Sequence, residues 1–194
     1  MQWLKAITVA AVMGVSSAAS AQAPAAPASP PSGMHPVLMG LTSTSFEDGG
    51  ILPDRYTAKA VPPGGSPALA WTSAPAGTKS FTLVMHDSDV VVGKSTADNT
   101  HWVAFNIPAT TTSLPEGVPK VPTLPDGTVQ IKVQGPYGYR PPGAPAGVYH
   151  HYIFEIYALD TKLDLTAEAT RVDVMKAMDG HVLDRGTLVG RFHR

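Results

Sequence analysis

The stretch Phe81-Thr82-Leu83-Val84-Met85-His86-Asp87 is a strand-length apolar run that ends in two polar residues. Short runs of this kind recur along the chain between clusters of proline and glycine, a pattern typical of β-strands joined by turns. With only 15% charged residues but 18 glycines and 19 prolines, the composition favours a turn-rich β protein over a helical one. The predicted strands are Val37–Leu41, Tyr56–Val61, Ala68–Trp71, Phe81–His86, His101–Ile107, Val129–Val133, His150–Leu159 and Thr187–Phe192.

A helix is predicted near the end of the sequence. Thr170 is placed to cap its first turn, with Asp173 three positions later completing an approximate capping box. Gly180 is placed to end the helix in the left-handed conformation. A second, shorter helix is expected over Thr166–Ala169. The pattern as a whole predicts a mainly β fold, an antiparallel β-sandwich or folded sheet with one or two peripheral C-terminal helices.

The N-terminal region has the pattern of a secretory signal. Residues 1–21 contain one positive charge, an apolar run and an Ala-x-Ala ending. The run is shorter than the roughly 20 residues of a membrane span, so we expect a mature chain without a transmembrane segment; a retained anchor is the alternative. Residues 22–35, rich in Ala, Pro and Ser, are predicted to be a disordered tether. Residues 36–194 then form one domain, and the protein is expected to be periplasmic or secreted.

The composition also excludes several classes of function. The chain has no cysteine, which rules out disulfides, thiolate catalysis and thiolate metal sites. A formal charge of −1 gives no basic excess, so we expect no nucleic-acid partner. The sequence contains neither a Gly-rich phosphate loop nor a Gly-x-Ser-x-Gly nucleophile motif. No cofactor is therefore expected.

Three polar residues at strand ends are the candidate site. Side chains alternate between the two faces of a strand, so each of these residues extends a row of apolar ones. The rows are Phe81, Leu83 and Met85 before Asp87; Val103, Phe105 and Ile107 after His101; and Tyr152, Phe154 and Ile156 after His150. Asp87, His101 and His150 could therefore line one pocket. The same alternation excludes from it their neighbours His86, His151 and Trp102.

Other interpretations of these residues remain open. A histidine at a strand end is commonly a solvated or hydrogen-bonded residue without a further role. Two histidines and a carboxylate also suit zinc or non-haem iron. However, no His-x-His or His-Glu-x-x-His spacing supports a metal site.

These residues also carry a resemblance to the phosphatidylethanolamine-binding protein family, also called Raf kinase inhibitor proteins, and in particular to its bacterial exported branch. The resemblance covers residues 36–194 and implies an antiparallel sheet packed on a second one, with a small anion pocket at one end. In that family the pocket takes phosphate-like groups and phospholipid headgroups. The matching stretches are Pro67–Trp71, Phe81–Asp89, His101–Pro108, His150–Asp160, Met178–Leu183 and Gly190–Phe192.

The resemblance assigns pocket positions residue by residue. Two segments depart from the family's pattern: Ser88–Val91 replaces the Pro and Ala-Pro of its Asp-Pro-Asp-Ala-Pro motif, and Arg140–Pro145 replaces its Gly-Pro-x-Pro-Pro motif. Gly143 is the best counterpart of the pocket glycine in that second segment. The ligand-binding residues that the resemblance implies are Asp87, Asp89, His101, Gly143, His150 and Tyr152.

The implied function is an exported, non-catalytic protein that binds a small phosphate-like anion or a phospholipid headgroup, with a protein partner as a further possibility. The alternatives are an inhibitor of a kinase or protease, and a hydrolase using Asp87 and His101 as an acid–base pair. An anion beside Asp87 needs compensation, which a protonated His101 or His150 would supply together with the Tyr152 hydroxyl. Binding is then expected to tighten as the pH falls through the histidine range.

Overall fold

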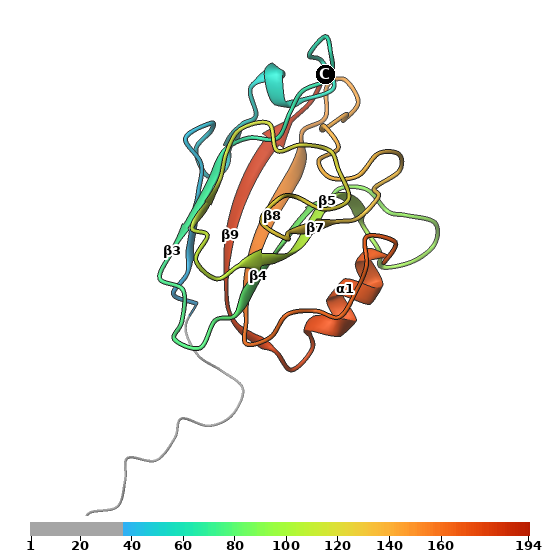
Figure 1. The fold of residues 1–194 in the computed structure, drawn as a ribbon. Helices are drawn as coiled ribbons and strands as arrows, with labels where there is room; N and C mark the ends of the chain where they lie inside the picture. Colours follow the sequence, from blue (N-terminus) through green and yellow to red (C-terminus); the bar gives the residue numbers. More distant parts are fainter. Residues whose placement is uncertain (1–36) are drawn as a thin grey trace, which may run out of the picture. The chain divides into compact units, whose positions relative to one another are not determined.

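The structure, a computed structural model, describes residues 37–194 (Figure 1). The predictions of a signal over residues 1–21 and a tether over residues 22–35 lie outside the described residues. The described chain is mainly β with one α-helix, as predicted. Its elements are β1 (Gly40–Thr42), β2 (Gly50–Ile51), the 3-10 helix η1 (Asp54–Tyr56), β3 (Leu69–Thr72), β4 (Ser80–Asp87), β5 (Asn99–Pro108), β6 (Ser113–Leu114), β7 (Val129–Gln130), β8 (His150–Leu159), α1 (Arg171–Met178) and β9 (Val182–Phe192).

The strands form two sheets. The larger has the order β2-β9-β8-β4-β5-β7, and the smaller has the order β1-β3-β6. All eight residues of β4 are buried, which explains why this central strand is a nearly continuous apolar run in the sequence. The two sheets share one apolar cluster, in which Trp71 of β3 meets Phe81 of β4 edge-on, with ring centroids 5.3 Å apart.

Helix α1 lies against the larger sheet beside β5 (Figure 1). Val174 and Met178 pack there in a second apolar cluster with residues of β4 and β5. The predicted capping box between Thr170 and Asp173 is present, and Gly180 has a φ of +81°. The helix ends therefore follow from local sequence, and its apolar side covers the face of the sheet that is turned away from the first cluster.

Three sequence-based predictions of secondary structure are wrong. Residues 166–169 form a turn, and β9 begins at Val182 instead of Thr187. Residues 56–61 form no strand, because the Thr57 hydroxyl donates to the Asp54 carbonyl oxygen (2.9 Å) and accepts from the Lys59 amide (3.2 Å). These local hydrogen bonds satisfy the backbone without a partner strand. The early start of β9 was hidden by Asp184, a buried carboxylate that accepts hydrogen bonds from two backbone amides near β1.

Strand β5 contains a β-bulge at His101. Met85 of β4 pairs with Trp102, whereas the next residue, His86, pairs with Thr100, so His101 is the extra residue of β5. The bulge shifts the alternation of side chains along the strand by one position. Trp102 consequently packs in the same apolar cluster as Met85, on the side of the sheet that the site occupies.

The face expected for His101 is therefore wrong in part. Val103 and Phe105 lie on the helix side of the sheet, not in one row with His101, and Trp102 lies in the cluster from which it was expected to point away. Its interpretation as a core residue is confirmed, because the side chain is fully buried. A second irregularity of β5, near Asn106 with its φ of 56°, brings Ile107 back to the Trp102 side.

Gly190 of β9, which pairs with Tyr152 of β8, provides a test of how tightly the first apolar cluster is packed. A Cβ at Gly190 would lie 2.7 Å from Leu52 Cγ and 3.1 Å from Phe46 Cε2, inside a buried cluster. We expect Gly190→Ala to lower the free energy of unfolding by about 1–3 kcal/mol in urea titrations, since both side chains must move. Thr187→Ser on the exposed side of β9 is the control and should change it by less than about 0.5 kcal/mol. Equal stability of the two variants would contradict the packing.

Candidate functional site

A cavity of about 140 Å³ lies where β4, β5 and β8 come together. Asp87, the last residue of β4, is paired with Asn99 at the start of β5 and with Tyr152 near the start of β8. Three strand ends therefore direct polar side chains to the same place. The cavity is lined by Asp87, Val90, Asn99, His101, Arg140, Gly143, Ala144, Pro145, His150 and Tyr152.

The structure brings together five of the six residues predicted for the site. They are Asp87, His101, Gly143, His150 and Tyr152. Asp89 does not line the cavity, because its carboxylate turns outward, accepts the His151 amide (2.6 Å) and pairs with the His151 ring (3.0 Å). Alternation had excluded His86, His151 and Trp102, and none of them lines the cavity.

Asn99 was missed by the sequence reasoning. Its position two residues before His101 on the same strand was the available signal. Arg140 was noted only as part of a segment that departs from the family's pattern, and its side chain proves to be a wall of the cavity.

Asp87 is a buried carboxylate held by two donors. The side chain is 2% exposed, its Oδ2 lies 2.7 Å from His150 Nδ1, and its Oδ1 accepts the backbone amide of Asp89 (3.0 Å). His150 therefore directs Nδ1 toward the carboxylate. Its Nε2 makes no hydrogen bond to residues 37–194 and is available to a ligand.

Both ring nitrogens of His101 are engaged in hydrogen bonds. Nδ1 lies 2.9 Å from the carbonyl oxygen of Arg140 and must donate to it, while Nε2 lies 3.2 Å from the side-chain nitrogen of Asn99. The Asn99 oxygen accepts from Gln134 Nε2 (2.7 Å), which leaves its nitrogen to donate to the ring. This arrangement fits a neutral imidazole with its proton on Nδ1.

The pKa of His101 agrees with the neutral imidazole that these hydrogen bonds indicate. Burial lowers the pKa of His101 to about 4, and the charge of the nearby Arg140 guanidinium acts in the same direction. The expectation of a protonated His101 is therefore wrong for the free protein between pH 5 and 8.

Tyr152 has a buried hydroxyl that meets no partner in full hydrogen-bond geometry among residues 37–194, although the Asp87 carboxylate and the Gly143 and Ala144 amides lie near it. Burial, together with the charge of Asp87, raises the pKa of Tyr152 well above its usual value, so the hydroxyl keeps its proton. The edge of the neighbouring His101 ring packs on it, with centroids 5.1 Å apart. A buried, unsatisfied hydroxyl costs about 1–3 kcal/mol, which a bound acceptor would recover.

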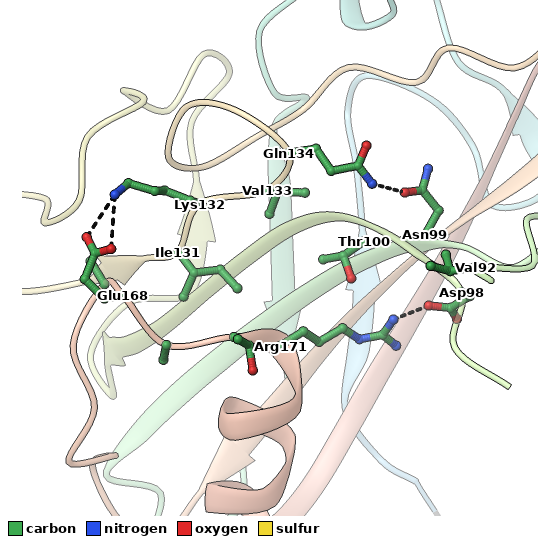
Figure 2. A pocket seen from close by; sticks show the side chains of 13 residues that line it. Val92, Asp98, Asn99, Thr100, Ile131, Lys132, Val133, Gln134, Glu168 and Arg171 are labelled. Atoms are coloured by element: carbon green, nitrogen blue, oxygen red, sulfur yellow. Dashed lines mark hydrogen bonds and ion pairs between the residues drawn. The ribbon is translucent and has the colours of Figure 1, made fainter. Parts of the chain in front are cut away.

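A larger cavity of about 370 Å³ lies next to α1, and Asn99 lines both cavities. Figure 2 shows that its two cationic side chains are already paired, Lys132 with Glu168 and Arg171 with Asp98. A wider hollow of about 600 Å³ shares the second of these pairs. The small cavity differs from both, because it contains donors that are not yet used.

Two structural searches of residues 37–194 found nothing. The region contains no group of three or more His, Cys, Asp or Glu side chains arranged to hold a metal ion. Within the same residues, no helix has the length and apolar character required to cross a membrane.

The comparisons with known sequences and structures all find relatives of one kind. The family model described as phosphatidylethanolamine-binding protein matches residues 42–193. A UPF0098 protein of Methanothermobacter thermautotrophicus is 44% identical over 157 residues, which cover 80% of this chain and 99% of the relative. The solved structure of a phosphatidylethanolamine-binding protein homolog from Chlamydia trachomatis is 30% identical, has a TM-score of 0.69 and covers 80% of this chain and 97% of its own. Escherichia coli YbcL, described as a member of the mammalian family, is 26% identical with a TM-score of 0.68, and covers 80% of this chain and 98% of its own.

The neutral state of His101 predicts a pH dependence of stability. Its folded-state pKa of about 4 lies below its ordinary value of 6.5, so the unfolded chain takes up this proton first and stability is lost as the pH falls from 6.5 to 4. His101→Gln should remove about 2 kcal/mol of the decrease in unfolding free energy between pH 7 and 4.5, measured by urea titration. Parallel pH profiles of the two proteins would show that the fold does not hold His101 neutral.

Proposed function

The chain belongs to the phosphatidylethanolamine-binding protein family, and from this premise we propose that it is an exported binding protein whose small cavity takes a phosphate-like group, such as a phospholipid headgroup. The observation that carries the proposal is the buried Tyr152 hydroxyl, which lines the cavity and meets no partner in full hydrogen-bond geometry among residues 37–194, although the Asp87 carboxylate lies near it. An anionic oxygen is the partner that such a donor lacks. The proposed export rests on the signal pattern of residues 1–21.

The Asp87–His150 pair explains how an anion can bind beside a carboxylate. Asp87 contacts Nδ1 of the His150 ring at 2.7 Å, so a protonated ring would form an ion pair with the carboxylate. Protonation turns Nε2 of His150 into a second donor, and the pair then presents no net charge to the anion. Tyr152 and His150 would therefore donate to different oxygens of one phosphate-like group. The affinity for this group would increase at lower pH, where the His150 ring can carry a second proton.

The same geometry favours binding over hydrolysis. A general base needs a free nitrogen to take a proton from the substrate, but both nitrogens of His101 are engaged by Asn99 and Arg140, and Asp87 contacts His150. We therefore propose a non-catalytic role. A cationic part of a headgroup would extend toward the rim of the cavity, where Asp89 lies beside His151.

Removal of the Tyr152 hydroxyl tests the carrying observation. Tyr152→Phe should weaken the binding of phosphate and phosphoethanolamine by about 10- to 100-fold in calorimetric titrations, the value of one hydrogen bond to a charged acceptor. The free variant should be as stable as the parent protein or more so, because an unsatisfied buried group is lost. Unchanged affinity in a folded Tyr152→Phe protein would contradict the proposal.

The protonation of His150 is tested with sulfate, which stays doubly ionised between pH 5 and 8. Affinity should be higher at pH 5 than at pH 8, because a protonated imidazole can donate to bound sulfate through Nε2. His150→Gln should flatten the profile, and His151→Gln, the exposed neighbour outside the cavity, should leave it intact. Equal affinity of the parent protein across the range would remove His150 protonation from the mechanism.

A further inference from the structure

The cavity wall contains a permanent positive charge that the implied set of ligand-binding residues lacks. Arg140 lines the cavity and makes no ion pair within residues 37–194. Its Nη1 donates to the Asn99 side-chain oxygen (3.2 Å) and lies 3.5 Å from the Thr100 carbonyl oxygen. Nε and Nη2 have no hydrogen-bond partner among the described residues. The guanidinium therefore retains unused donors next to an unsatisfied hydroxyl.

A closed ring of hydrogen bonds holds Arg140 in place. Its Nη1 donates to Asn99, the Asn99 nitrogen donates to His101 Nε2, and His101 Nδ1 donates back to the Arg140 carbonyl. The Arg140 amide also donates to the His101 carbonyl (2.8 Å). Gln134 fixes the Asn99 amide from the side of the larger cavity, as Figure 2 shows. A side chain ordered in advance loses less entropy when it binds a ligand.

The charges around the cavity show what Arg140 contributes. Asp87 brings one negative charge, and His101 is neutral because of its burial. Without Arg140, an anion would face a net negative charge whenever His150 is neutral. With Arg140 the balance is zero in that state and positive once His150 is protonated, so an anion meets no net repulsion even in mildly alkaline solution.

We propose that Arg140 binds the phosphate-like group directly and is the residue that selects an oxyanion over a cationic amine. This inference rests on the proposed function and deepens it. Its planar fork of donors can hold two oxygens of one tetrahedral group, which Lys cannot do with the same geometry. His101 is then a positioning residue, which acts through its two contacts to Arg140 and through Asn99.

The test is calorimetry at pH 8, where the Arg140 guanidinium keeps its charge, with inorganic phosphate and sulfate as probes. Arg140→Gln should weaken binding by about 10- to 100-fold, because it removes charge-assisted hydrogen bonds. Arg140→Lys keeps the charge but loses the fork and should weaken it by about 3- to 10-fold. Arg191→Gln removes an equal charge from the exposed surface, outside the cavity, and should stay within about twofold of the parent protein.

Two outcomes separate this inference from the proposed function. If Arg140→Gln and the parent protein bind phosphate equally while Tyr152→Phe binds it weakly, Arg140 is not a ligand and the proposed function stands. If the parent protein binds neither phosphate nor phosphoethanolamine, both fail. Arg140→Lys guards against loss of fold, since a folded variant that binds like the parent also excludes a role for the fork.

An additional titration distinguishes a lipid headgroup from a free anion as the source of the phosphate-like group. Inorganic phosphate is compared with glycerophosphoethanolamine, which carries the phosphodiester of a lipid headgroup. Tighter binding of the diester, lost equally in Arg140→Gln, would identify a lipid headgroup as the occupant. Tighter binding of inorganic phosphate, lost in the same variant, would identify the free anion. Loss of affinity for neither probe would overturn the inference.

Discussion

The burial of the Asp87 carboxylate is the constraint on which the rest of the site depends. A carboxylate that is 2% exposed must be compensated, because an isolated buried charge costs several kcal/mol even after relaxation. One part of the compensation is local, the Asp89 amide, and the rest comes from distant positions in the sequence: the His150 ring and, across the cavity, the charge of Arg140. The cavity therefore holds one negative charge together with the groups that we propose as ligands of an anion.

The bulge in β5 is what makes this balance possible. A regular strand would direct His101 and Trp102 to opposite faces, but the extra residue lets Trp102 pack in the core while His101 still lines the cavity. In that position His101 is too well enclosed to be a charged ligand. Its hydrogen bonds to the Arg140 carbonyl and to Asn99 instead make it part of the wall, and the wall in turn orders a guanidinium. The role of the histidine thus passes from binding to positioning.

The two larger cavities illustrate why volume alone does not identify a site. Arg171 and Lys132 line them, but each of these cations is already neutralised by a carboxylate. Within residues 37–194, the small cavity instead has a buried hydroxyl that meets no partner in full hydrogen-bond geometry, an imidazole nitrogen without a partner and a guanidinium with unused donors. These groups are the reason why we propose the anion site in the small cavity and not in the larger ones.

The sequence by itself determined the mainly β architecture, the capped C-terminal helix and the membership of the family, because strand-length apolar runs, a Thr170 cap and ordered motifs are local patterns that need no partner to be recognised. It also indicated that Asp87, His101 and His150 would meet, since alternation carries that information as long as the strands are regular. Only the tertiary structure decided the bulge at His101, the outward turn of Asp89 and the place of Asn99 and Arg140 in the cavity wall. An inserted residue is defined by the pairing of one strand with another, and the charge of a histidine is set by burial and by neighbours that the fold brings from distant positions. Neither is contained in the order of residues along a single strand.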